Sequence, residues 1–336
     1  MKPWILSLAA AVLIAGCTPA PTPDKTNPAP AKAADTGPKK TIAFITNNTS
    51  DFWVVAHKGA DKAAAELPGY TIDFKTNSEG DAAGQKRIMD DLVAKGVAGI
   101  AISPFHAESQ TADLNTIAAK IPLITQDSDA PDSNRACYIG TDNVAAGTMA
   151  GQELKKALPN GGTVMVFVGD KGVQNAKERY AGLTKALEGT KIKILDIRTD
   201  EAQPARAKQN AADTLVKYPD IAGLVGLWGY NGPQISAAVK EAGKTGKVKI
   251  VCFDDDPITL AAVKDGTISA TIVQQQFEFG YKSMMLLAQL IEGDKGTIPA
   301  DKRILIPPDK KIIIPTMVVD SSTIEAFEAK AAELKK

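Results

Sequence analysis

The feature that most constrains the fold of this chain is a regular alternation of short β-branched runs with longer helical stretches, which begins at Thr41. The runs are apolar throughout, as expected of strands in a sheet that is covered on both faces. The strand-like runs include 41–46, 70–76, 98–103, 121–126, 163–168, 191–197, 221–225, 248–253 and 267–273. The helical stretches include 84–95, 143–157, 176–187, 205–217 and 279–291. This alternation predicts an α/β fold with doubly wound parallel sheets.

The second half of the chain repeats the order of the first half. Residues 98–102 form an apolar run, which is followed by a helical stretch and by another apolar run that ends at Asp127. Residues 222–226 begin the same order, which ends at Asp254. In open α/β sheets, ligands bind outside the carboxyl ends of the strands. We therefore expect two similar lobes with a ligand-binding cleft between them.

Length and charge narrow the class of protein further. The chain has 336 residues, of which the first 38 differ in composition from the rest. The remaining length corresponds to about two domains of roughly 150 residues each. Lys+Arg and Asp+Glu number 39 each, so the formal net charge is zero. Because phosphate binding needs a basic surface, we expect no nucleic-acid partner.

The N-terminus has the pattern of an export signal. Met1 and Lys2 precede an apolar run over residues 4–15, which is too short for a membrane-spanning helix. Residues 14–17, Ile-Ala-Gly-Cys, resemble the bacterial lipobox, which implies a signal peptide over 1–16 and a lipid on Cys17. A plain secretory signal or an uncut anchor are the alternatives. Residues 18–38 are rich in Pro, Ala, Thr and Lys and predict a disordered tether.

The chain lacks the usual signals for catalysis or metal binding. The two cysteines besides Cys17 lie in apolar runs, so we expect Cys137 and Cys252 to be buried free thiols rather than a disulfide. The chain has only two histidines, no metal-ligand spacing and no nucleophile elbow. Residues 243–245, Gly-Lys-Thr, lack the earlier glycine of a P-loop and predict a helix end and turn. We expect a non-enzymatic protein without a cofactor or a metal.

Polar and aromatic side chains gather where the predicted strands end. They are Asn47, Asn48, Ser50, Phe52, Trp53, Asp127, Asp254 and Gln274. Carboxylates and amides can bind the hydroxyls of a sugar, and an aromatic ring can pack on its C–H face. Taken singly, Asp127 or Asp254 could equally be a turn residue or a helix N-cap, and Trp53 could belong to the core.

As a set, these motifs resemble the ribose-type periplasmic sugar-binding proteins of ATP-driven importers, from Thr41 to Phe327. The resemblance is carried by residues 41–45, Phe-Trp at 52–53, 121–127, Asp-Asn-x3-Gly at 142–147, Glu-Arg-x2-Gly at 178–182, 253–254 and 270–274. It implies a type I periplasmic binding protein with two doubly wound lobes, a hinge of three crossing segments and a monomeric chain. The N-terminal lobe would contain residues 39–141 plus 274–312, and the C-terminal lobe 142–273 plus 313–336.

The resemblance also implies which residues bind the ligand. Those of the N-terminal lobe are Asn47, Ser50, Phe52, Trp53 and Asp127, facing Arg179 and Asp254, with Gln274 near a crossing segment. Arg179 could instead be a solvated charge on a helix. Ser128 stands where ribose binders have an Arg, Trp228 stands where they have an amide, and a family aromatic contact is lost near Ala202. These departures favour a sugar or polyol other than ribose.

The resemblance implies a lipoprotein at the periplasm or cell surface that delivers a small sugar to an ABC transporter permease. A periplasmic module that presents its sugar to a receptor kinase is the alternative. A lactose-repressor-type transcription factor would need a helix-turn-helix in place of the N-terminal signal. A sugar isomerase would need Asp127 and Asp254 to lie close together as an acid–base pair.

Overall fold

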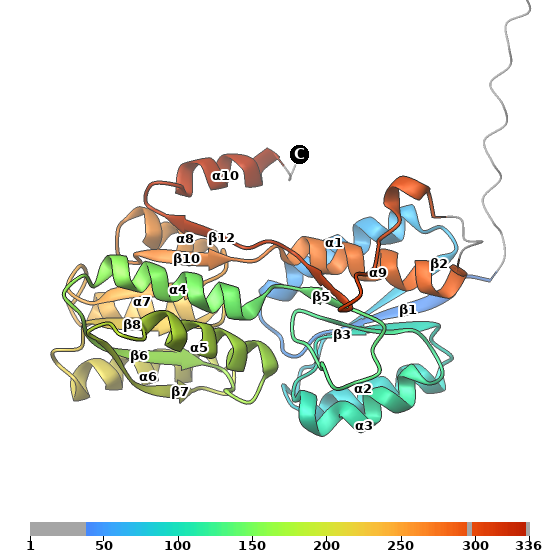
Figure 1. Cartoon of the computed structure of the whole chain (residues 1–336), viewed down its shortest axis with the longest axis horizontal. Helices are drawn as coiled ribbons and strands as arrows, with labels where there is room; N and C mark the ends of the chain where they lie inside the picture. The colour runs from blue at the N-terminus through green and yellow to red at the C-terminus, as the bar shows by residue number, and fades with distance from the viewer. Residues whose placement is uncertain (1–37, 294–297, 334–336) are drawn as a thin grey trace, which may run out of the picture. The chain divides into compact units, whose positions relative to one another are not determined.

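The computed structural model describes residues 38–293 and 298–333. The predicted signal peptide, Cys17 and most of the tether lie outside these residues. The described chain forms two six-stranded sheets, each covered by helices on both faces (Figure 1). The predicted fold class, two doubly wound α/β lobes, is therefore confirmed.

The first sheet has the strand order β11-β5-β4-β3-β1-β2, and all of its neighbouring strands are parallel. Its strands are β1 (Lys40–Ile45), β2 (Tyr70–Lys75), β3 (Gly99–Ile102), β4 (Leu123–Gln126), β5 (Tyr138–Gly140) and β11 (Lys311–Ile313). Helices α1 (Phe52–Glu66) and α9 (Gln276–Glu292) pack on one face, and α2 (Ala82–Ala94) and α3 (Ala107–Ala118) pack on the other. A short 3-10 helix, Ala300–Lys302, follows α9.

The second sheet has the order β12-β10-β9-β8-β6-β7, and only β12 runs antiparallel to its neighbour. Its strands are β6 (Gly162–Val168), β7 (Ile192–Thr199), β8 (Gly223–Gly226), β9 (Lys249–Phe253), β10 (Ala270–Val273) and β12 (Met317–Asp320). Helices α4 (Asn143–Ala157) and α5 (Gln174–Leu187) cover one face. Helices α6 (Pro204–Lys217), α7 (Asn231–Glu241), α8 (Pro257–Lys264) and α10 (Ile324–Glu333) cover the other.

Glycines allow one pair of helices in each lobe to approach at backbone distance. A Cβ at Gly59 of α1 or at Gly280 of α9 would overlap the backbone of the other helix. Gly147 of α4 and Gly182 of α5 make the same approach in the second lobe. Figure 1 shows both pairs lying side by side. These contacts fix α5, which carries part of the site described below.

The chain passes between the two sheets three times, after β5, after β10 and after β11. Thr141 lies on the first of these connections and Gln274 on the second. The Thr141 hydroxyl donates to Gln274 Oε1 at 3.0 Å, which joins the two connections directly. The connections therefore lie next to the carboxyl ends of β4, β9 and β10, where the candidate ligand residues are placed.

Two further expectations can be checked in the described residues. Cys137 and Cys252 are both buried and unpaired, as predicted. Helix α7 ends at Glu241 and Gly243 adopts a φ of 62°, so residues 243–245 form a helix end and turn, as predicted. Among residues 38–293 and 298–333, no helix is both long and apolar enough to cross a membrane.

Candidate functional site

One cavity gathers side chains from the strand ends of both sheets. Its lining residues are Asn47, Asn48, Ser50, Phe52, Trp53, Asp127, Asn175, Arg179, Trp228, Gly229, Tyr230, Asp254 and Gln274. About 320 Å³ between these residues is free of protein atoms, part of it open to solvent. The structure therefore brings together every predicted ligand-binding residue except Ser128.

Asp127 occupies a strained turn at the end of β4. Its φ is 58°, a left-handed conformation that is uncommon for a residue other than glycine, and the amide of Ser128 donates to the carbonyl of Gln126 at 2.7 Å. The Asp127 carboxylate is buried, and its Oδ2 accepts from the Ser103 hydroxyl at 2.8 Å and from Asn175 Nδ2 at 3.2 Å. Strained residues of this kind concentrate at functional sites.

Ser128 follows this turn directly but is not among the residues that line the cavity. The chain reverses at Asp127, so that Gln126 and Ser128 pair with each other across it. The Ser128 hydroxyl is buried and has no hydrogen-bond partner among the described residues. The prediction that Ser128 lies with Asp127 in the cavity is thus not matched by the cavity lining, although the two residues are adjacent in the sequence.

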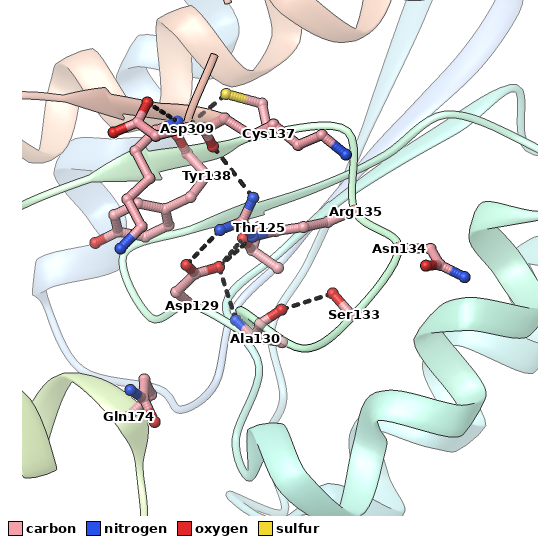
Figure 2. A network of polar contacts seen from close by, with 12 residues as sticks. Thr125, Asp129, Ala130, Ser133, Asn134, Arg135, Cys137, Tyr138, Gln174 and Asp309 are labelled. Carbon is pink, nitrogen blue, oxygen red and sulfur yellow. Dashed lines mark hydrogen bonds and ion pairs between the residues drawn. The ribbon is translucent and has the colours of Figure 1, made fainter. Parts of the chain in front are cut away.

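A buried ion pair holds the loop that follows this turn (Figure 2). Arg135 donates from Nε to Asp129 Oδ1 at 2.5 Å and from Nη2 to Oδ2 at 2.7 Å, and both side chains are almost fully buried. Thr125 of β4 donates to the same carboxylate at 2.6 Å. Arg135 Nη1 also donates to the carbonyl of Lys310, next to β11, at 3.1 Å. The network thus ties the Asp127 turn to the strand that precedes the third connection between the sheets.

Asp254 occupies a matching position after β9 in the second sheet. Its φ is 67°, it is buried, and its Oδ1 accepts from Gln274 Nε2 at 2.9 Å. The interpretation of Asp254 as a helix cap is wrong, because the residue that caps α8 is Asp256, which accepts from the amide of Ile258 at 2.8 Å. A side chain at Gly229 would have its Cβ 3.0 Å from Asp254 Oδ2, so glycine keeps this oxygen accessible.

Burial raises the pKa of both carboxyl groups, to about 6 for Asp127 and to about 7 for Asp254. The positive charge of Arg179 opposes the shift in each case. The protein therefore holds two carboxylates at a free-energy cost that hydrogen-bond donors from a ligand would reduce.

Arg179 is the central cation of the site. It is only 1% exposed, which excludes the interpretation as a solvated surface charge. Its Nε donates to Asn143 Oδ1 at 2.9 Å, its Nη1 donates to the carbonyl of Leu227 at 2.7 Å, and its guanidinium lies 4.5 Å from the ring centre of Phe253. Its Nη2 has no partner among the described residues. A buried charged donor without a partner is costly, so this atom points to a bound acceptor.

Aromatic rings from both lobes line the same cavity. Trp53 donates its indole N–H to Asn48 Oδ1 at 3.1 Å, and it belongs to the core of its lobe and also lines the cavity. Trp228 is 7% exposed, lies against Gly169 and donates its indole N–H to Asn175 Oδ1 at 3.1 Å. It too contributes both to the core of its lobe and to the cavity.

Three lining residues were not predicted from the sequence, namely Asn175, Gly229 and Tyr230, while Asn48 was predicted at the strand ends but not among the ligand-binding residues that the resemblance implies. Asn48 and Gly229 are direct neighbours of predicted residues. Asn175 lies four residues before Arg179 on α5, and this spacing places two residues on one helix face, so the signal for it was present. No group of three or more His, Cys, Asp or Glu side chains that could hold a metal occurs in the described part of the chain.

Comparisons with known proteins agree with this arrangement. The profile of the periplasmic binding protein domain matches residues 42–295. The chain is 28% identical over 274 residues to the ribose import binding protein RbsB of Salmonella typhimurium, covering 80% of this chain and 91% of that protein. A solute-binding protein of an ABC transporter from Burkholderia graminis, solved in complex with D-arabinose, superposes with a TM-score of 0.77 at 28% identity and covers 88% of this chain and 98% of that one. Another solute-binding protein of an ABC transporter, from Agrobacterium vitis and solved with bound D-fucose, superposes with a TM-score of 0.78 at 28% identity. This match covers 86% of this chain and 98% of that one.

Proposed function

We propose that this chain, which belongs to the periplasmic binding protein family, captures a small monosaccharide or polyol in the cavity and delivers it to an ABC-type permease. The observation that carries the proposal is the set of polar atoms left free around one cavity. Asp127 Oδ1, Asp254 Oδ2 and Arg179 Nη2 have no partner among the described residues. They offer two charged acceptors and one charged donor.

This set suits a ligand rich in hydroxyl groups. A hydroxyl both donates and accepts, so one sugar can donate to the two carboxylates and accept from the guanidinium. Hydrogen bonds to charged groups are the stronger ones. Phe52, Trp53 and Trp228 supply apolar surface for the C–H face of a ring. Relatives whose names state ribose, D-allose, D-arabinose or D-fucose support a sugar as the ligand class.

We further propose that binding is accompanied by closure of two rigid bodies, residues 39–141 plus 274–312 and residues 142–273 plus 313–336. The three connections between the sheets would act as the hinge. The hydrogen bonds from Thr141 to Gln274 and from Gln274 to Asp254 support this assignment, because they link two of the connections to a ligand residue. A sugar that touches Asp127 and Asp254 would favour the closed arrangement.

A thermal-shift screen tests the proposed function. Protein without the tether would be mixed with pentoses, hexoses, deoxy sugars and alditols. A ligand at 100 times its Kd stabilises the folded state by roughly 2.7 kcal/mol, so its binding is readily detected. If no sugar or polyol raises the melting temperature, the proposed ligand class is wrong.

The departures from ribose binders predict the specificity. We expect a ligand with more C–H surface or fewer hydroxyls than ribose, such as a deoxy sugar or an alditol, because Trp228 adds aromatic surface and the serine at position 128 lies outside the cavity lining and lacks the fork of donors that an Arg supplies. If the ring of Trp228 packs on the sugar, Trp228→Phe should lose part of the ligand-induced fluorescence change and some affinity. Ribose as the tightest ligand, together with unchanged binding by Trp228→Phe, would refute this specificity.

We also propose that a lipid on Cys17 anchors the protein at the periplasmic or cell surface, with residues 18–38 as the tether. The support is the Ile-Ala-Gly-Cys sequence after the apolar run. In bacteria, Cys17→Ser should leave the protein unlipidated and move it from the membrane fraction to the soluble fraction. A Cys17→Ser protein that still sediments with membranes like the parent would contradict the anchor.

A further inference from the structure

Asn175 connects the two lobes inside the cavity. It lies on α5 in the second lobe and is 3% exposed. Its Nδ2 donates to Asp127 Oδ2, in the first lobe, at 3.2 Å. Its Oδ1 accepts the indole N–H of Trp228, in its own lobe, at 3.1 Å. We propose that Asn175 is a positioning residue that bridges the closed lobes, rather than a ligand of the sugar, an inference that rests on the proposed function.

The chemistry of the partners fixes the orientation of the Asn175 amide. The indole nitrogen of Trp228 can only donate, so the oxygen of the amide must face it. The amino group must then face Asp127, whose ionised carboxylate can only accept. A flipped amide would place donor against donor and acceptor against acceptor. Trp228 therefore orients Asn175, and Asn175 in turn orients the carboxylate of Asp127.

Two of the other contacts between the lobes join side chains that are much more exposed. His106 Nε2 lies 3.1 Å from Asp170 Oδ2, and Lys177 Nζ lies 2.8 Å from Glu108 Oε1. Exposed ion pairs contribute little, because water and salt screen them. The buried hydrogen bond from Asn175 to a carboxylate is shielded from water. Among these contacts, Asn175 should therefore contribute most to closure.

The bridge also determines what Asp127 can offer to a sugar. Its Oδ2 already accepts from the Ser103 hydroxyl at 2.8 Å and from Asn175. Only Oδ1 remains without a partner among the described residues. Asp127 therefore offers a sugar only one of its two carboxylate oxygens, whereas a carboxylate with two free oxygens can bind a neighbouring pair of hydroxyls with one oxygen each.

The distance between the lobes tests the bridge without any ligand. Spin labels on Ser109→Cys and Lys193→Cys, both exposed positions on different lobes, report this distance by pulsed electron resonance, while Cys137 and Cys252 are buried. In the ligand-free protein, Asn175→Ala should shift the distances to longer values. Asn175→Asp should do the same at pH 7.5, because a carboxylate would then face Asp127. The matched control is Gln174→Ala, because Gln174 bonds to Glu178 on its own helix.

The sugar affinity is then measured with the tightest ligand of the thermal-shift screen. We expect Asn175→Ala to weaken it about tenfold and Gln174→Ala to leave it unchanged. Weaker binding by Asn175→Ala with unchanged distances in the ligand-free protein would identify Asn175 as a sugar ligand and overturn the bridge. The bridge would also be overturned if neither variant changed the distances, or if the ligand-free parent already had the long distances of open lobes. If no sugar binds but the distances lengthen, the proposed function fails while the bridge stands. Asn175→Asp preserves the shape of the side chain and gives the same test if Asn175→Ala folds poorly.

Discussion

Arg135→Ala is expected to lower the free energy of unfolding by about 3–5 kcal/mol, the usual effect of removing one partner of a buried ion pair. Asp129 would keep a buried charge without its bidentate partner, and the carbonyl of Lys310 would lose one of its donors. Denaturation by urea, followed by circular dichroism, measures the change.

Two comparisons make this result specific. Arg87→Ala removes a cation from an exposed pair with Glu79 and should change stability by less than about 1 kcal/mol. The double variant Asp129→Ala/Arg135→Ala should recover part of the loss, because it leaves no unpaired charge. An Arg135→Ala protein within about 1 kcal/mol of the parent would show that the ion pair does not hold the loop.

Asp254→Asn is expected to weaken sugar binding by about ten- to a hundredfold, because a hydrogen bond to a charged group contributes roughly 1.5–3 kcal/mol. Asp127→Asn should have a similar effect, since each carboxylate keeps one oxygen free at the cavity. Isothermal titration calorimetry with the tightest sugar measures both. Asp256→Ala is the matched control: it removes the cap of α8, so it should cost about 1 kcal/mol of stability and leave the affinity unchanged.

The pH dependence separates a ligand role of Asp254 from a structural role. Its pKa is about 7 in the folded protein, against about 3.9 for Asp in unfolded chains. The folded state thus binds the proton more tightly, and the stabilisation this gives is complete below about pH 4 and is lost as the pH rises through 7. At pH 7.5, ligand-free Asp254→Asn should therefore be more stable than the parent. A less stable Asp254→Asn protein would identify the carboxylate as a structural group.

Sugar affinity should follow the opposite trend. Hydroxyl donors bind the ionised carboxylates, so the parent should bind more tightly at pH 7.5 than at pH 5, where most Asp127 and Asp254 side chains carry a proton. Affinity that does not change between these two values would show that neither carboxylate accepts from the sugar.

The sequence was sufficient for most of the fold because the strands are buried on both faces and read as continuous apolar runs. Helix α4 has the predicted bounds, and its start is marked by the N-cap Asp142. Strand β10 begins at Ala270, three residues after the predicted start, because the apolar run includes the chain that leads out of the turn at Gly266. Strands β11 and β12 were not predicted. They have three and four residues and pair at sheet edges with partners far away in the sequence.

The sequence was sufficient to predict those site residues that directly follow a strand. Asp127 and Asp254 follow apolar runs, and the parallel sheets bring such ends to one edge. The direction of a side chain after a strained turn cannot be read from the sequence, which is why Ser128 was placed with Asp127. The role of Asn175 depends on a contact between two lobes, and no local pattern encodes it. The unpartnered Nη2 of Arg179 likewise appears only in three dimensions.

A crystal structure with the tightest sugar of the screen would show directly whether the cavity binds the ligand as proposed. We expect sugar oxygens within hydrogen-bonding distance of Asp127 Oδ1, Asp254 Oδ2 and Arg179 Nη2, with Asn175 still bonded to Asp127 and Trp228. A sugar bound elsewhere, or one in this cavity that leaves these three atoms bonded only to water, would contradict it.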